Sequence, residues 1–413
     1  MSNKKSFLGG IVTGVLAAAL LLSGVFMGRS AWNLYQASRT QETSSQSTEE
    51  NESSIANPET MNKLKLLEDT IGKYYLEGVD EQTLEKGVYD GLVEALGDPY
   101  SVYYSAEELQ EMRNKTEGIY YGIGAYIGID ADTSLPRLTG IIEGTPAQES
   151  GLRTGDLLYK VDGEEVQGLE LTQVVSKVKG EEGTTVHLTI IREGESDYLE
   201  IDVVRRKVES PTVNQKMLEN DIGYIQITEF DTVTLDQFTE ALAVCRGSGM
   251  KGLILDLRGN PGGNLNTVCD IARELLPKGL IVYTEDKNGK RSEYTCDGTN
   301  QIKVPLVVLV DRGSASASEI LAGAIKDYGI GTLVGTTTFG KGIVQRIISF
   351  SDGSAVKLTV SYYYTPNGNN IHKIGISPDV EEKFDGEAYY NDNVDNQLNK
   401  AIEIMNEKLG GIQ

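Results

Sequence analysis

Residues 311–345 read DRGSASASEILAGAIKDYGIGTLVGTTTFGKGIVQ, and the predicted core is built around this segment. The apolar run that precedes it, 304–310, predicts a buried strand. Small residues then turn the chain, and apolar residues at helical spacing in 319–328 predict a helix. Ser316 therefore lies near a helix N-terminus, at the C-terminal end of a core strand. A serine in that place can face a cleft, where free backbone N–H groups bind an anion.

A nucleophilic serine needs a base, and the sequence contains only two histidines, His187 and His372. His187 falls in a predicted strand of a different domain, and His372 falls in a late loop. Lys341 is the other option, because an ammonium in a dry, apolar pocket loses its proton more easily. It follows Ser316 by 25 positions, a span that fits one helix, a short strand at 331–335 and a loop back to the same sheet edge. The sequence thus predicts a Ser–Lys dyad, a known variant of the serine-hydrolase site.

Two glycine-rich strings also resemble nucleotide-binding loops. Residues 335–341, GTTTFGK, match a phosphate-binding P-loop except that Gly342 replaces the Ser or Thr that binds magnesium. A P-loop must open a helix, whereas 343–350 is typical of a strand that leads to a turn. Residues 122–124 form a Gly-x-Gly, but Ile127 stands where a dinucleotide-binding loop has its third glycine. Both nucleotide-binding interpretations are therefore disfavoured.

Taken alone, Ser-Ala-Ser-Ala is an ordinary helix start and Gly-Lys-Gly an ordinary turn. Together, GSASASE followed by FGKGIVQ resembles the C-terminal processing peptidases, also called tail-specific proteases. The resemblance implies a serine endopeptidase in which Ser316 is the nucleophile and Lys341 the general base. Gln345 matches the third member of the family's site, which orients the lysine. The resemblance extends over about residues 61–383.

The core before this stretch repeats the order of strand, turn and helix. Residues 252–257 predict a buried strand, and GNPGG then leads into a helix that ends near residue 276. Such alternation predicts a mostly parallel sheet with sites at the C-terminal ends of its strands. The resemblance implies a crotonase/ClpP-like α/β sheet unit, in which the backbone N–H groups of Gly262 and Ala317 form the oxyanion hole. Loss of one such donor typically lowers the rate by about 10²–10³-fold.

Residues 118–206 change to the period of strands. Segment 119–129 predicts a strand, and TPAQESGLRTGDLLYKVDG at 145–163 resembles a PDZ domain. PDZ domains bind an extended C-terminal peptide as an added strand and hold its carboxylate with the N–H groups of a glycine-containing loop. The alternative is a domain that serves only in packing. The carboxylate-binding loop that the resemblance implies consists of Gly122, Ile123, Gly124 and Ala125.

The N-terminal segment favours a membrane anchor. Residues 7–27 are uncharged and mostly apolar, about the length that spans a bilayer as a helix. Lys4 and Lys5 precede this run and a single Arg29 follows it, which favours an uncleaved signal anchor with the rest of the chain outside the cytoplasm. A cleaved signal peptide is the alternative, although no clear cleavage site follows the run. Residues 31–58 are rich in Ser, Thr, Glu and Gln and predict a disordered linker.

The remaining segments are predicted to be helical. Residues 59–117 carry amphipathic patterns and predict a helical cap, which in the resembled family helps to form dimers, so a homodimer is expected. Residues 391–413 predict an amphipathic C-terminal helix. The predicted organisation is a cytoplasmic stub with a transmembrane signal anchor (1–30), a disordered linker (31–58), a helical region (59–117), a PDZ domain (118–206), a serine protease core (207–390) and the C-terminal helix (391–413).

Composition limits the partners of the chain. Its 413 residues include 38 Lys and Arg against 61 Asp and Glu, a net charge of −23. Such a chain repels nucleic acid and anionic membrane surfaces, so neither is an expected partner of the soluble part. Three scattered cysteines are too few for a disulfide framework or a metal site, and no cofactor or metal is expected.

These observations together predict a single-pass, membrane-anchored serine endopeptidase whose catalytic part lies outside the cytoplasm. Its PDZ domain is expected to capture the accessible C-terminus of a protein or peptide substrate. Two other classes stay open: a catalytically silent, membrane-tethered PDZ scaffold that binds C-terminal tails, and an extracytoplasmic ligand-binding protein with the same α/β core. A scaffold has no need of Ser316, Lys341 and Gln345 together, so the endopeptidase is favoured.

Overall fold

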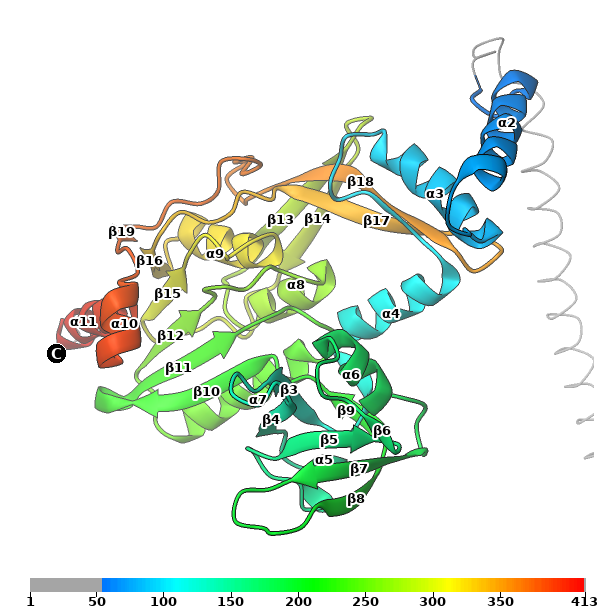
Figure 1. Cartoon of the computed structure of the whole chain (residues 1–413). Coiled ribbons are helices and arrows are strands. Elements are labelled where there is room, and N and C mark those ends of the chain that lie inside the picture. Colours follow the sequence, from blue (N-terminus) through cyan, green and yellow to red (C-terminus); the bar gives the residue numbers. More distant parts are fainter. Residues whose placement is uncertain (1–53, 412–413) are drawn as a thin grey trace, which may run out of the picture. The chain divides into compact units, whose positions relative to one another are not determined.

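The computed structural model describes residues 54–411 (Figure 1). The predicted anchor at 7–27 and most of the predicted linker lie outside the described residues. The chain divides into two units, residues 1–84 and residues 85–413. Within residues 54–411, no helix combines the length and the apolar composition that crossing a membrane requires.

The described part of the first unit is mainly α2 (Pro58–Tyr74). Asn57 caps α2 by accepting a hydrogen bond from a first-turn N–H, and Pro58 fits the first turn because that position needs no amide donor. No residue of α2 is buried, and the apolar side chains of Leu66 and Leu67 are exposed. The helix therefore carries an apolar face without a partner among the described residues.

The core of the second unit is a six-stranded sheet. Its strands, in spatial order, are β10 (Val213–Leu218), β11 (Ile222–Ile227), β12 (Gly252–Asp256), β15 (Leu306–Val310), β16 (Gly331–Gly335) and β19 (Val380–Glu381). The pair β10–β11 is antiparallel, and the other pairs are parallel. β12 and β15 are buried along their whole length, as central strands covered on both faces must be. The mostly parallel sheet predicted from the sequence is confirmed.

Helices cover both faces of this sheet (Figure 1). On one face lie α7 (Thr234–Gly247), α8 (Leu265–Arg273) and α9 (Ala317–Asp327). On the other face, Ala401 and Met405 of α11 (Asn396–Gly410) pack against apolar side chains of the central strands. The result is a three-layer α/β/α core whose strand ends are held rigidly from both sides.

The C-terminal helix starts later than the sequence predicts. A separate α10 (Gly386–Asp392) overlaps the first residues of the predicted helix and ends at its C-cap, Asn393, whose φ is 55°. Asp395 then caps α11 by accepting a hydrogen bond from the Leu398 N–H. The prediction of one helix from residue 391 is therefore wrong, because the left-handed backbone of Asn393 ends α10 and the Asp395 side chain caps the start of α11.

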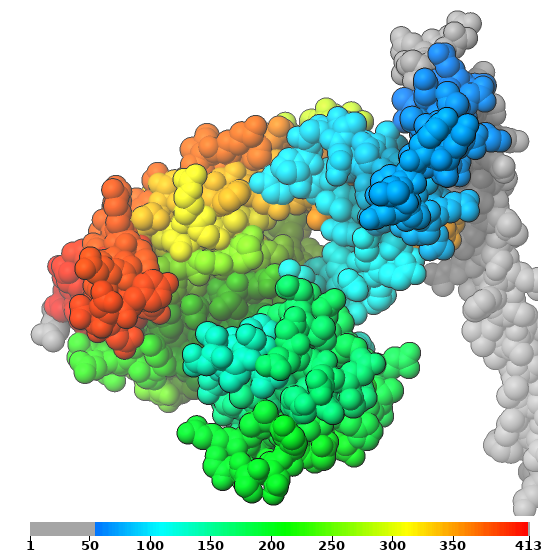
Figure 2. Space-filling view, in the orientation of Figure 1, coloured from blue at the N-terminus to red at the C-terminus, as the bar shows by residue number. Residues whose placement is uncertain are grey.

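A second, antiparallel sheet completes the core. It contains β1 (Val102–Tyr104), β18 (Ala355–Tyr364), β13 (Gly279–Asp286) and β14 (Arg291–Cys296), and β17 (Ile343–Ser349) also pairs with β18. β1 separates α3 (Glu81–Glu94) from α4 (Ala106–Glu117), so the predicted all-helical character of 59–117 is wrong at this point. The aromatic and β-branched residues of β1 find their partner far along the chain, in β18. In Figure 2 the cyan part of the chain, near residue 100, lies against the yellow-to-orange part.

The PDZ segment has its own sheet and its own apolar core. Its elements are β3 (Ala125–Ile129), β4 (Pro136–Ile141), α5 (Pro146–Glu149), β5 (Leu157–Val161), β6 (Glu164–Glu165), α6 (Leu171–Val178), β7 (Thr185–Ile191) and β8 (Leu199–Val204). The predicted single strand 119–129 is wrong, since β2 (Ile119–Gly122) pairs with β9 (Arg206–Glu209) while β3 pairs with β4. Gly124, with φ 83°, redirects the chain between the two strands.

Candidate active site

Ser316 follows β15 and stands at the N-terminal end of α9, as predicted. Its backbone has φ 54° and ψ −110°, a region that non-glycine residues rarely adopt. Two hydrogen bonds hold this conformation: the Ser316 N–H donates to Glu319 Oε2 at 2.9 Å, and the Tyr363 hydroxyl donates to the Ser316 carbonyl at 3.0 Å. Such stored strain is typical of a side chain that is held out of a sharp turn for function.

Gly262 and Ala317 lie together beside Ser316. A Cβ added to Gly262 would lie 2.8 Å from the Ser316 Cβ and 3.0 Å from the Ala317 nitrogen, and Gly262 has φ 108°. Only glycine fits this approach, because a side chain would collide with the turn around Ser316. The Ala317 N–H donates to no other described residue. The Gly262 N–H, in contrast, donates to Asn260 Oδ1 at 2.8 Å, so one of the two predicted oxyanion donors is engaged in this structure.

Asn260 joins the turn around Gly262 to the turn around Ser316. It is fully buried, and its side-chain amide donates to the Ile227 carbonyl at 2.9 Å. Its own backbone carbonyl accepts the Ala315 N–H and the Ser318 hydroxyl, each at 3.0 Å. These bonds fix the two turns relative to each other, which explains why Gly262 and Ala317 converge.

Lys341 lies in the loop between β16 and β17, half-buried. Its ammonium stands over the ring of Tyr100, 4.4 Å from the ring centroid, and makes no hydrogen bond or ion pair with a described residue. The Lys341 amine is therefore not bonded to Ser316. Burial lowers the pKa of Lys341 and nearby Lys357 lowers it further, while Asp98 acts in the opposite direction. A lysine with a lowered pKa is suited to general-base chemistry.

Glu319 is a member of this site that the sequence analysis missed. Its carboxylate is fully buried on α9 and accepts four hydrogen bonds. Oε2 accepts from the backbone of Ser316 and Lys341, and Oε1 accepts from the Thr338 hydroxyl and the Gly340 N–H. The spacing Ser-x-x-Glu from residue 316 to residue 319 is a capping-box pattern, and it was the available signal.

Gln345 lies on β17, four positions after Lys341. A bulge between Val344 and Gln345 alters the local register against β18, a device that re-aims side chains beside functional sites. The Gln345 amide donates to the Thr359 hydroxyl at 3.3 Å and makes no bond to Lys341. The structure thus brings the predicted Gln345 to the same region without joining it to the lysine.

His372 also lies beside the lysine loop, which the sequence did not indicate. A Cβ on Gly342 would stand 2.7 Å from the His372 backbone nitrogen. The buried Nδ1 atom of His372 has no hydrogen-bond partner among the described residues, and burial lowers the pKa of the imidazole. His187, on β7 of the PDZ segment, is exposed.

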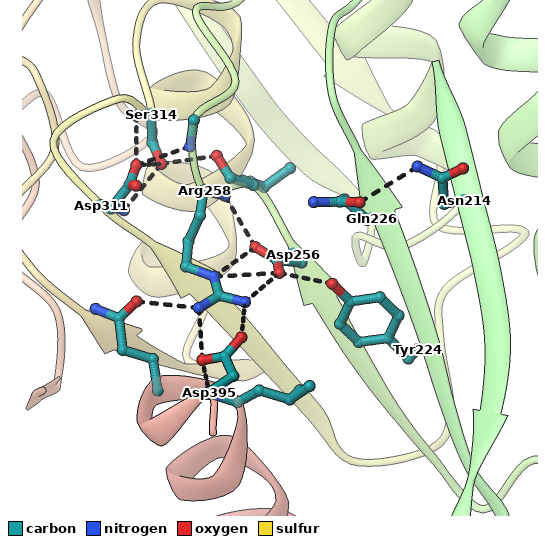
Figure 3. Close-up of polar contacts among 12 residues, drawn as sticks. Asn214, Tyr224, Gln226, Asp256, Arg258, Asp311, Ser314 and Asp395 are labelled. Atoms are coloured by element: carbon teal, nitrogen blue, oxygen red, sulfur yellow. Dashed lines mark hydrogen bonds and ion pairs between the residues drawn. The ribbon is translucent and has the colours of Figure 1, made fainter. Parts of the chain in front are cut away.

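A buried ionic network supports the strand that leads into the glycine turn (Figure 3). The Arg258 guanidinium joins Asp256, at the end of β12, to Asp395, the cap of α11, with closest contacts of 2.7 and 2.8 Å. The Tyr224 hydroxyl donates to the same Asp256 carboxylate at 2.7 Å. Next along the chain, the Gly259 N–H donates to Asp311 Oδ1 at 2.9 Å. The network thus connects α11, on one face of the sheet, to the two turns of the site.

The predicted carboxylate-binding loop lies between β2 and β3. The carbonyls of Ile123 and Gly124 accept the N–H groups of Ala147 and Ile142 at 2.7 and 3.0 Å. The N–H groups of Ile123 and Gly124 donate to no described residue. This loop, from Gly122 to Ala125, therefore has a fixed backbone with free donors, the arrangement that an anionic carboxylate requires.

The structure also bears on cofactors. The string GTTTFGK leads into β17 and not into a helix, so it lacks the context of a P-loop. In the part of the chain that the structure describes, no three His, Cys, Asp or Glu side chains are grouped as a metal site requires. Cys245, Cys269 and Cys296 are free and buried.

Three family descriptions match segments of the chain. Residues 221–382 match peptidase family S41. Residues 137–192 match the PDZ domain. Residues 19–108 match the description "Activating protease CtpB N-terminal domain".

Similar proteins cover most of the chain. The carboxy-terminal processing protease CtpB of Bacillus subtilis is 33% identical over 376 residues, which are 90% of this chain and 78% of that protein. The carboxyl-terminal-processing protease of Synechocystis is 35% identical over 320 residues, 76% of this chain and 75% of that protein. A putative S41 protease from Bacteroides fragilis has a solved structure with a TM-score of 0.50 and 18% identity, covering 78% of this chain and 90% of that one, and shares the fold.

Proposed function

Because the chain belongs to the carboxy-terminal processing proteases of peptidase family S41 and is a serine-type peptidase, we propose that Ser316 is its nucleophile and Lys341 its general base. One observation carries the proposal: the backbone N–H groups of both residues donate to the same buried carboxylate, Glu319. With both backbones fixed in this way, rotation of the lysine side chain is the step that brings its amine to the serine. Such prior positioning of reacting groups supplies much of an enzyme's rate enhancement.

The reaction proceeds through an acyl-enzyme. The neutral amine of Lys341 accepts the hydroxyl proton of Ser316 as the oxygen attacks the peptide carbonyl carbon. Collapse of the tetrahedral intermediate breaks the C–N bond, and the lysine ammonium gives its proton to the leaving amine. Water then attacks the ester on Ser316, with Lys341 again accepting a proton, and the serine hydroxyl is regenerated. Gln345 is proposed to orient Lys341 once the lysine has turned toward the serine.

The oxyanion of the intermediate is assigned to the N–H groups of Ala317 and Gly262. Ala317 supports this assignment directly, because its N–H is free and stands at the start of α9, where the helix dipole favours negative charge. Gly262 must first exchange its bond to Asn260 for one to the substrate oxygen. Glycine can make that backbone rotation without steric cost.

The PDZ domain implies binding of a peptide C-terminus. We assign the substrate carboxylate to the loop from Gly122 to Ala125, on the strength of its free N–H groups at Ile123 and Gly124. The proposed substrate is therefore a protein or peptide with an accessible C-terminal tail. The PDZ domain holds this tail as an added strand while a peptide bond elsewhere in the substrate is cut.

Cleavage assays on matched enzymes and substrates test this function. The full chain in detergent and its Ser316→Ala and Lys341→Ala variants receive an unfolded protein with an apolar C-terminal tail, and the same protein with an amidated C-terminus. Lys303→Ala, at an exposed lysine, is the control. We expect wild type and control to cut, both site variants to bind without cutting, and the amidated substrate to be cut more slowly. Cutting by Ser316→Ala contradicts the assigned nucleophile, and binding without cutting by every protein supports a silent scaffold.

We further propose that residues 7–27 anchor the protein in the cell membrane as a single-pass helix, with the catalytic part outside the cytoplasm. The proposal rests on the apolar run and on Lys4 and Lys5 before it. Membrane fractionation of the full chain and of a chain that starts at residue 54 tests the anchor. Recovery of both chains in the soluble fraction contradicts it.

A homodimer through the helical region is also proposed. It is supported by the exposed apolar side chains of α2, among them Leu66 and Leu67. Sedimentation of the full chain and of a double Leu66→Glu, Leu67→Glu variant tests it: the wild type is expected to sediment as a dimer and the variant as a monomer. Equal sedimentation of the two contradicts an interface through α2.

A further inference from the structure

We propose that Tyr100 is a positioning residue for Lys341: its ring holds the lysine ammonium in a resting position, from which the lysine must leave to reach Ser316. The inference rests on the proposed role of Lys341 as base and adds to it a residue outside the family's Ser, Lys and Gln positions. It assigns a function to the turn at 97–101, which joins α3 to β1.

The geometry of Lys341 is that of a cation over a ring face. Its Nζ lies 4.4 Å from the Tyr100 ring centroid, inside the range of about 6 Å in which such pairs attract. A general base must approach the proton that it takes to about 2.6–3.2 Å between heavy atoms, and no hydrogen bond joins the Lys341 amine to Ser316. The face of a tyrosine ring attracts an ammonium and not a neutral amine. This position therefore favours the charged form of Lys341, which cannot act as base.

Tyr100 is fixed in place by its own turn. The Asp98 carboxylate accepts the Tyr100 N–H at 3.1 Å and the Ser101 hydroxyl at 2.6 Å. The Ser101 oxygen in turn accepts the Thr359 N–H at 3.3 Å. The strand that follows, β1, pairs with β18. The ring thus belongs to the folded core and does not sit on a free loop.

The turn and the lysine loop approach from opposite edges of one strand. Lys357 of β18 is opposite Val102 of β1 on one edge and opposite Ile347 of β17 on the other. Lys341 leads into β17, so β18 sets the distance between the lysine loop and the Tyr100 turn. The contact between Lys341 and Tyr100 is a consequence of this pairing.

Thr359 extends the resting arrangement to Gln345. The Gln345 amide donates to the Thr359 hydroxyl at 3.3 Å, while the Thr359 backbone holds Ser101 of the turn. The residue proposed to orient Lys341 is thus bonded toward the turn and not toward the lysine. Before substrate binds, Lys341 thus contacts Tyr100, and Gln345 bonds to Thr359, which is itself bonded to the Tyr100 turn.

Charged and titratable groups surround Lys341 from four directions. They are Asp98 in the turn, Lys357 on β18, Glu319 on α9 and His372 in the loop beside Gly342. Asp98 favours the ammonium, whereas burial and Lys357 favour the neutral amine. The Tyr100 ring, like Asp98, favours the charged form of Lys341. Its removal should therefore make Lys341 easier to deprotonate.

Chemical labelling of Lys341 tests the proposal without relying on activity. The full chain carrying Ser316→Ala, which prevents self-cleavage, is combined with Tyr100→Leu or Tyr100→Phe. Brief reductive methylation with formaldehyde and cyanoborohydride across a pH series modifies only neutral amines, and mass spectrometry quantifies the peptide that contains Lys341. Lys160, which stands over Tyr159 at 5.4 Å in the PDZ segment, is the internal control.

Tyr100→Leu is expected to move the midpoint of Lys341 labelling to lower pH, with about two- to fivefold faster labelling below the midpoint. Tyr100→Phe keeps the ring face and is expected to retain the wild-type midpoint, and Lys160 should not change. If the labelling rate of Lys341 in Tyr100→Leu rises by the same factor at every pH, the variant has only exposed the lysine, and the proposal is overturned. A Tyr100→Leu midpoint equal to that of wild type also overturns it. An equal shift in both variants overturns it as well, because the ring face is then not the cause. Thermal unfolding of each variant verifies that it is folded.

Activity provides a second, separable test in the chain with Ser316 intact. The acid limb of the kcat/KM profile, which reports the free enzyme, should move to lower pH in Tyr100→Leu, and Tyr100→Phe should restore the wild-type limb. If Lys341→Ala still cuts, the proposed base is wrong, yet the labelling result still decides whether Tyr100 holds the ammonium. If Lys341→Ala is inactive and Tyr100→Leu does not change the midpoint of Lys341 labelling, Lys341 remains the proposed base and the role proposed for Tyr100 is wrong.

Discussion

The backbone N–H groups of Ser316 and Lys341 donate to one and the same atom, Oε2 of Glu319, each at 2.9 Å. The second oxygen of that carboxylate accepts the Thr338 hydroxyl at 2.6 Å and the Gly340 N–H at 2.7 Å. A fully buried carboxylate is costly unless it is fully hydrogen-bonded, and here four donors satisfy it. Glu319 thus sets the distance between the turn around Ser316 and the loop that carries Lys341.

Glu319→Gln should damage the site much more than its small change in size suggests. The amide places an NH₂ group against two of the four donors that the carboxylate accepts, and those two donors lose their acceptor. We expect a fall in kcat of at least about 10²-fold from misplacement of the reacting groups, and a loss of about 2–3 kcal/mol in the free energy of unfolding. Urea titration and kcat measurements check both, with the exposed Glu407→Gln as control. Near-wild-type kcat in Glu319→Gln contradicts the positioning role.

The proposed base predicts a rise of activity with pH. Burial lowers the pKa of Lys341, so the neutral amine forms below the usual lysine range and activity is lost as the pH falls through that pKa. Lys341→Arg should be inactive at every pH, because a guanidinium does not lose its proton. His372→Gln tests the other candidate, since burial lowers the pKa of His372 too. An acid limb that disappears in His372→Gln assigns the base to the histidine instead.

Asp231 should make the protein less stable as the pH rises. The side chain is only 5% exposed, and burial, with a smaller contribution from Glu229, raises its pKa to about 7 while Lys115 opposes the change. The folded pKa lies above the unfolded value of about 3.9, so the native state holds more protons between about pH 4 and pH 7. The free energy of unfolding therefore falls across that window.

Asp231→Asn should remove this fall, because the amide stays neutral. We expect the variant to exceed wild type by on the order of 1–2 kcal/mol at pH 8 and to match it near pH 4. Urea denaturation at the two pH values measures the difference, and Asp132→Asn, at an exposed aspartate, is the control. A variant that is less stable than wild type at pH 8 would mean that the ionised carboxylate has a favourable partner.

Arg258→Met should break the network that links β12 to α11. It leaves Asp256 and Asp395 without their cation, a change that costs about 3–5 kcal/mol when a charge remains buried. The deficit should shrink as the pH falls, since the unpaired carboxylates take up protons. In wild type, burial raises the pKa of Asp395, but the bond to Arg258 helps to hold that pKa below its usual value. The stability that this ion pair adds to wild type is therefore lost as the pH falls.

Urea denaturation of wild type and Arg258→Met at pH 8 and pH 5 measures this narrowing. Arg246→Met, at an exposed arginine in the last turn of α7, serves as the control. A deficit that stays constant between the two pH values contradicts buried, unpaired carboxylates as its cause.

The local half of the site could be predicted from the sequence. The apolar run, the small residues and the helical spacing around Ser316 are contiguous, and each specifies its element by short-range pattern. Gly262 could be placed beside Ala317 because the same order of strand, turn and helix occurs twice. The role of Glu319 was within reach as well, since its spacing from Ser316 is that of a capping box.

The other half depends on pairing between distant segments. Tyr100 precedes Lys341 by more than 240 positions and reaches it through the pairing of β1 with β18, which no local period reveals. The bond from Gly262 to Asn260 was equally hidden, because it depends on the detailed path of a tight turn. The sequence could identify the candidate site residues Gly262 and Lys341. It could not show that Gly262 bonds to Asn260 or that Lys341 lies over Tyr100.

β18 has a further consequence for the life of the enzyme. The strand joins segments that are synthesised far apart: the Tyr100 turn comes early, Ser316 and Lys341 come more than two hundred residues later, and β18 itself comes last of these. A nascent copy that has not yet made β18 therefore holds the Lys341 loop and the Tyr100 turn at no fixed distance. The proposed resting position of Lys341 is thus available only to a chain in which β18, the last strand of this sheet to be synthesised, has already paired.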